Sequence, residues 1–150
     1  MVNNMIALLL QVPTLLALSD SSRTTAGVLL VTIVGIAYGG TFVLRLVRGQ
    51  QAATPFQLAF SRAGHAHAGV LVILGLVCQI LVDAAQMDGV FGVLARNGVP
   101  LAAILMPAGF FFSSIGKGIT QPNRFIWLLY LGIVPLTLGV LSLGIGLLVG

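Results

Sequence analysis

Two histidines, His65 and His67, are the residues best suited to chemistry in this chain, and one alanine separates them in RAGHAHAGVL. They are the only histidines among the 150 residues and stand near the start of a long apolar run. An imidazole ring can bind a metal ion or haem iron, and it can carry a proton near neutral pH. The chemistry open to the chain therefore depends on what lies beside these two rings.

A metal site formed by this chain alone is not expected. Zinc and copper sites need three or four suitable ligands, and besides the histidines the chain offers one cysteine, three acidic residues and four methionines. Residues at i and i+2 of a helix point about 200° apart, so His65 and His67 cannot share one ion. Cys78 lies in the middle of a predicted helix, and we expect it to be a small core residue.

A haem site requires fewer protein ligands than a zinc or copper site, because a single axial histidine can hold haem. The HAH triplet resembles the HxH of haem–copper oxidase catalytic subunits, in which two histidines on opposite faces of a helix serve two haems. The resemblance covers three residues, and the other histidines of that family are absent from this sequence. A haem b on His65 or His67 would therefore lie between two copies of the chain, or between the chain and a histidine-bearing partner.

Four basic residues are predicted to gather at the same membrane surface as the histidines, without a carboxylate: Arg45, Arg62, Lys117 and Arg124. Such a cluster suits a lipid phosphate, a haem propionate or an acidic loop of a partner subunit. The alternative is that these side chains only anchor the helices, with their charged ends reaching into the headgroup region.

The elements that position these residues follow from composition. The chain is 58% hydrophobic and 7% charged, with a mean hydropathy of +1.11, whereas a soluble domain carries about 25% charged residues. We therefore predict an integral membrane protein. Its net charge of +4 indicates topology and contact with anionic headgroups rather than nucleic acid.

Four apolar segments can each cross about 30 Å of hydrocarbon as a helix of about 20 residues. They cover residues 25–47, 63–82, 93–115 and 125–149. The predicted fold is all-α, with four transmembrane helices bundled in one domain over residues 1–150. Residues 5–19 are apolar but short, and we expect an interfacial helix there; a fifth crossing is the alternative. That segment lacks the basic start and cleavage pattern of a signal peptide.

The basic residues also predict an orientation in the cell membrane. Positive loops stay in the cytoplasm, and five of the seven basic residues fall in the first and third predicted loops. The second loop is predicted to hold Asp83, Asp88 and Arg96. Both basic loops should therefore be cytoplasmic and the C-terminus extracytoplasmic.

Further polar residues suggest two other activities. His65, Gln79 and Asp83 fall near one face of the second predicted helix, which would suit stations of a proton path if water filled the gaps. Pro107 and Pro135 should kink their helices, and such kinks can open a cavity. No hydrolase, nucleotide-binding or metalloprotease motif is present.

The function that fits these features best is a non-catalytic membrane subunit or accessory protein. It would act in a homo-oligomer or in a larger complex, such as a respiratory assembly. The alternatives are an electron-transfer subunit that holds haem b through His65 or His67, and a small transporter or lipid-binding protein.

Overall fold

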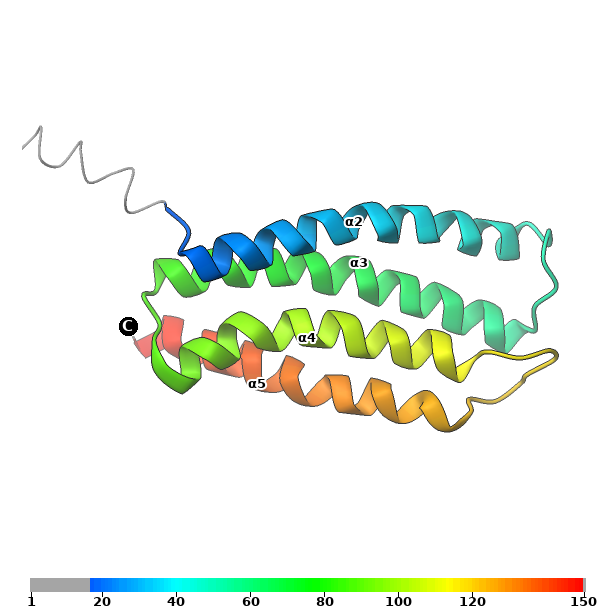
Figure 1. Cartoon of the computed structure of the whole chain (residues 1–150). Helices are drawn as coiled ribbons and strands as arrows, with labels where there is room; N and C mark the ends of the chain where they lie inside the picture. The colour runs from blue at the N-terminus through cyan, green and yellow to red at the C-terminus, as the bar shows by residue number, and fades with distance from the viewer. Residues whose placement is uncertain (1–16, 150) are drawn as a thin grey trace, which may run out of the picture.

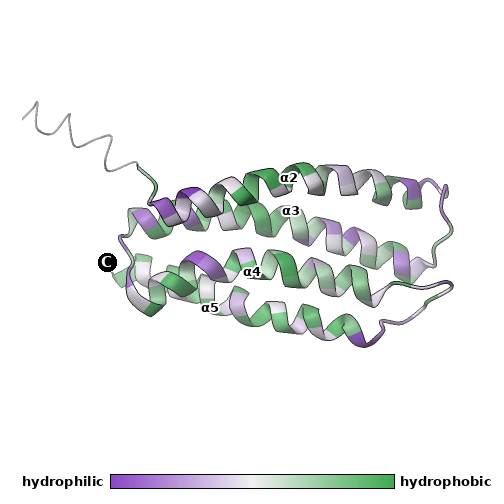
Figure 2. Cartoon of the chain, viewed as in Figure 1, coloured by the Kyte–Doolittle hydropathy of each residue, from purple (hydrophilic) through white to green (hydrophobic). Residues whose placement is uncertain are grey.

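The computed structural model describes residues 17–149, and every regular element in that range is helical (Figure 1). The elements are α2 (Asp20–Val47), α3 (Pro55–Ala84), α4 (Gly89–Ser113), the 3-10 turn η1 (Arg124–Ile126) and α5 (Trp127–Val149). Among residues 17–149, four helices are long and apolar enough to cross a membrane, which confirms the predicted all-α class and the four predicted membrane-length helices for that part of the chain. Figure 2 shows hydrophobic residues along the helices and hydrophilic residues concentrated toward their ends.

The predicted short helix over residues 5–19 falls almost wholly outside the described residues. Residues 17–19 are described, and they lead into α2 without regular structure.

α2, α3 and α4 begin before the apolar windows that predicted them, because their N-cap residues lie outside those windows. α4 ends at Ser113, two residues before the end of its predicted window, and α5 begins at Trp127, two residues after the start of its own. Thr54 caps α3 and forms a capping box with Gln57, and Pro55 occupies the first turn, where proline is favoured. The start of α3 at Pro55 rather than residue 63 places Arg62 inside the helix, which corrects its predicted position in a loop. Asp83 and Arg96 likewise belong to α3 and α4 and not to the second loop.

The four helices pack in chain order, with α2 and α5 in the outer positions (Figure 1). α3 buries eight residues and α4 nine, whereas α2 and α5 bury three each. The core lies between α3, α4 and α5 and comprises Leu71, Cys78, Val82, Ala95, Val99, Ala102, Met106 and Leu143. Cys78 is 1% exposed, as expected of a small core residue.

The contact between α4 and α5 is close enough to bring backbone against backbone. A Cβ added to Gly98 would clash with the carbonyl oxygen of Pro135 and would lie 2.8 Å from Cα of Gly139. A Cβ on Gly109 would lie 2.8 Å from Cα of Leu129. Small residues permit this approach, so these glycines set the spacing of the two helices.

The contact between α2 and α3 is much looser. α2 buries only Ser22, Leu29 and Leu46, which lie toward its two ends. Leu29 packs near α3, where its Cδ1 would be 3.1 Å from a Cβ on Gly75. Between Leu29 and Leu46, the middle of α2 has no buried residue.

Candidate functional site

His65 faces α2 across this loosely packed middle region. A Cβ on Gly40 would lie 3.2 Å from both Cε1 and Nε2 of the imidazole. The ring is half-buried and lines a shallow cavity of about 320 Å³. The cavity walls are Thr32, Gly35, Ile36 and Gly39 of α2, His65 and Ala68 of α3, and Phe111 of α4. His65 is therefore positioned to meet a group that enters between α2 and its neighbours.

His67 faces a different neighbour, α4. Its Nδ1 lies 2.8 Å from the carbonyl oxygen of Ala63, and its ring centroid lies 4.8 Å from that of Phe110. A carbonyl oxygen only accepts, so Nδ1 carries the proton and Nε2 keeps its lone pair when the ring is neutral. Among residues 17–149 no group of three or more potential metal-ligating side chains forms, and the two imidazoles lie on different sides of α3.

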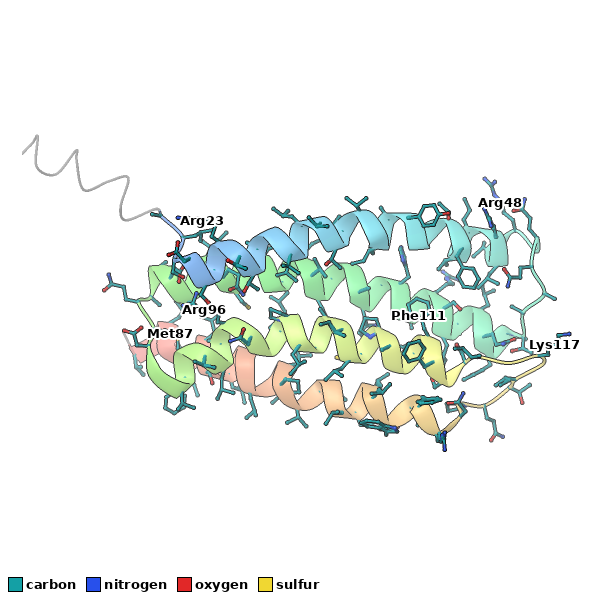
Figure 3. All side chains as sticks on the ribbon, in the orientation of Figure 1. Arg23, Arg48, Met87, Arg96, Phe111 and Lys117 are labelled. Atoms are coloured by element: carbon teal, nitrogen blue, oxygen red, sulfur yellow. The ribbon has the colours of Figure 1, made fainter. Side chains whose placement is uncertain are left out.

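The basic residues are concentrated at the end of the molecule formed by the C-termini of α2 and α4 and the N-termini of α3 and α5. The predicted cluster of Arg45, Arg62, Lys117 and Arg124 lies there, together with Arg48. All three acidic residues of the chain lie at or near the opposite helix ends. Figure 3 shows Arg48 and Lys117 at one end and Arg23 and Arg96 at the other. We call these the basic end and the acidic end.

A second and larger cavity, of about 860 Å³, opens at the basic end. We call it the basic-end groove. Phe42 and Leu46 of α2 form one wall, Phe111 and Phe112 of α4 form another, and Lys117 stands at its rim. Arg124 belongs to η1, where its guanidinium lies 5.4 Å from the ring centroid of Phe125. Of the four predicted anion-binding residues, only Lys117 lines this groove.

Sequence reasoning missed a polar network at the acidic end. Nη1 of Arg96 lies 2.8 Å from Oδ1 of Asp83, with side-chain exposures of 15% and 13%. The same nitrogen also donates to the hydroxyls of Ser19 and Ser22. Ser19 completes the network by donating its backbone N–H to Oδ2 of Asp83 at 2.8 Å. The network therefore ties the start of α2 to α3 and α4.

Gln79 extends this network into the core. It is fully buried, and its Nε2 donates to the carbonyl oxygens of Arg96 at 2.8 Å and Gly75 at 3.2 Å. Its Oε1 has no partner among the described residues. Gln79 and Asp83 thus belong to the polar network at the acidic end. His65 lies about 21 Å from Gln79 along the helix, because each residue adds about 1.5 Å of rise. The structure does not bring the three proposed proton-path residues together.

Neither cavity lies at Pro107 or Pro135, the two prolines whose kinks were predicted to open one. Pro107 is buried within α4 and Pro135 lies within α5, but neither residue lines either cavity. Both cavities are instead lined in part by α2. The chain matches no protein-family model, no curated protein and no solved structure.

Proposed function

We propose that the chain is a non-catalytic integral membrane subunit that assembles with a second copy or with other membrane subunits through the middle of α2. The observation that carries this proposal is the open face around Gly35 and Gly39. A Cβ at either position would meet no atom within 4 Å, although both residues line the cavity beside His65.

Glycine lowers the stability of a helix but permits close contact between helices. Glycine inside a helix is about 1 kcal/mol less favourable than alanine, and it offers no side chain to pack. Its benefit is the close approach of another helix, and glycines four residues apart form a recurrent transmembrane contact. Within this chain, α4 and α5 use glycine in that way. A partner helix on Gly35 and Gly39 would gain the same benefit and could hydrogen-bond His65.

The assembly can be tested by native mass spectrometry and cross-linking of the purified protein in mild detergent. We expect an oligomer or a copurifying partner from native membranes, and we expect Gly35→Leu and Gly39→Leu to abolish it. Gly144→Leu is the matched control, because a Cβ on Gly144 of α5 also meets no atom within 4 Å. A stable monomer without partners in the wild type would overturn the proposal.

The proposed orientation places the basic end in the cytoplasm and the C-terminus outside, in the cell membrane. The segregation of five basic residues from all three acidic ones supports it, because positive loops are retained in the cytoplasm. In a Cys78→Ala background, cysteine at Gln51 should be protected from an impermeant thiol reagent in intact cells. Labelling at Gln51 would reverse the orientation.

A second candidate function is electron transfer through haem b bound by His65. It is favoured by the open cavity at the His65 ring, whereas His67 is packed against Phe110. A partner or second copy would supply another ligand. Protein from native membranes should then show a Soret band that His65→Ala removes and His67→Ala retains. A wild-type preparation without that band would exclude this function.

A further inference from the structure

The basic-end groove combines an apolar interior with a polar rim. The large apolar side chains that line it are two from α2, two from α4 and one from the loop that follows α4: Phe42, Leu46, Phe111, Phe112 and Ile115. The polar side chains of Gln57, Ser61 and Lys117 also line it. The groove therefore suits a molecule with a polar head and an apolar tail.

The rim of the groove is built by specific contacts between two loops and α3. Nε2 of Gln57 donates to the carbonyl oxygens of Ser114 at 2.9 Å and Gly116 at 2.7 Å. The hydroxyl of Thr54 donates to the carbonyl oxygen of Ile119. These bonds hold the loop that carries Lys117 against the start of α3. Lys117 lies between Gly116 and Gly118, whose φ values of 136° and 66° favour glycine.

The charge around the groove is of one sign. Lys117 stands at the rim, and Arg45 and Arg48 flank the groove-lining Leu46 near the end of α2. Neither salt bridge formed by the described residues involves these three basic residues, and every carboxylate side chain of the chain belongs to the acidic end. The groove is thus complementary to an anion whose remaining surface is apolar.

We propose that the basic-end groove binds one anionic phospholipid. Its phosphate lies against Lys117 at the rim, and one acyl chain lies between α2 and α4. Each basic residue near an anionic lipid surface contributes about 1 kcal/mol of attraction, and the apolar walls favour the chain. This site is distinct from the helix-docking face proposed above, because Gly35 and Gly39 do not line the groove, although Phe111 lines both cavities.

The test is native mass spectrometry of the full chain from nanodiscs that contain phosphatidylcholine and phosphatidylglycerol. We expect one retained phosphatidylglycerol, preferred over phosphatidylcholine about ten-fold, as one to two basic contacts would provide. Lys117→Glu should reduce the preference to near unity. Ile115→Trp, at a groove-lining residue that is 65% exposed, should reduce retention of both lipids by occupying the space of the acyl chain.

Arg124→Glu is the matched control. It makes the same charge change at the same end of the molecule, on an exposed residue that does not line the groove. Loss of preference in Lys117→Glu with retention in Arg124→Glu supports the groove. Equal loss in both variants would show a general surface-charge effect, and a wild type without lipid preference would also overturn the proposal.

Discussion

The contact of α4 with α5 and the contact of α2 with α3 both contain glycines, but the glycines have opposite consequences. At Gly98 the backbone of α5 occupies the place where a Cβ would be, whereas at Gly35 and Gly39 that place is open. α4 and α5 are thus in close backbone contact along their length. α2, in contrast, is held against its neighbours only toward its ends, by the polar network at Ser22 and by Leu29 and Leu46. Both cavities border α2, so the loosely held helix is where another molecule can enter.

The largest expected effect comes from disrupting the close pair of helices. Gly98→Ala would place a Cβ against the backbone of α5, which cannot yield without separating the helices. We expect the free energy of unfolding to fall by about 3 kcal/mol, the upper range for overpacking. Unfolding in mixed micelles measures it, with Gly144→Ala as control. A change within 0.5 kcal/mol of that control, roughly the scatter of neutral substitutions, would contradict the close contact.

The next effect comes from releasing the anchored end of α2. Asp83→Ala leaves Arg96 without its carboxylate, and we expect a loss of about 2 kcal/mol in the free energy of unfolding, less than for a fully buried pair. Asp20→Ala should change it far less, because Asp20 is 98% exposed in its pair with Arg23. Replacing Asp83 and Arg96 together by leucine should recover stability. No recovery would show that the hydrogen bonds of these two residues with Ser19 and Ser22 contribute more stability than the ion pair does.

A smaller effect is expected where α2 meets the His65 ring. Gly40→Ala places a methyl group 3.2 Å from the imidazole, which can move into the cavity. The free energy of unfolding should change by about 1 kcal/mol or less. Reaction of His65 with diethyl pyrocarbonate should change, whereas reaction of His67 on the α4 side should not. A loss as large as that of Gly98→Ala would mean that α2 and α3 are rigidly packed.

The smallest expected effect is an increase in the free energy of unfolding. Gly35→Ala adds a methyl group to open space and removes the helix penalty of glycine, so the monomer should gain up to about 1 kcal/mol. The measurement is made in detergent that keeps the protein monomeric. Destabilisation there would place another part of the chain on this face and remove the contrast with Gly98.

The sequence predicted the all-helical class and the four membrane-length helices of the described residues, because the length of the apolar segments is sufficient to predict both. It did not predict the start of α3, since the signal lies in Thr54, Pro55 and Gln57, outside the apolar run. The Asp83–Arg96 pair was missed because Asp83 falls one residue beyond the predicted second helix and Arg96 was counted with the second loop, although it lies near the start of the segment 93–115. An arginine within an apolar helix requires a partner, and correct boundaries would have prompted a search for one.

The sequence predicted the directions in which the two histidines face, but not the cavities beside the helices. Helical geometry predicted that His65 and His67 face different neighbours, and the structure places them beside α2 and α4. The cavities could not be predicted, because they depend on how closely α2 approaches α3. That distance follows from packing across the interface and not from the order of residues along either helix.

The Asp83–Arg96 pair affects the free energy of inserting α3 and α4 into a bilayer. Charged side chains raise the free energy of inserting a helix by about 3 kcal/mol at the bilayer centre and less toward its ends. α3 and α4 are joined by residues 85–88, so they can insert together as a hairpin whose two largely buried charges neutralise each other. Either helix alone would carry an unmatched charge. Insertion of the two segments as one unit should therefore cost less free energy than insertion of either segment alone.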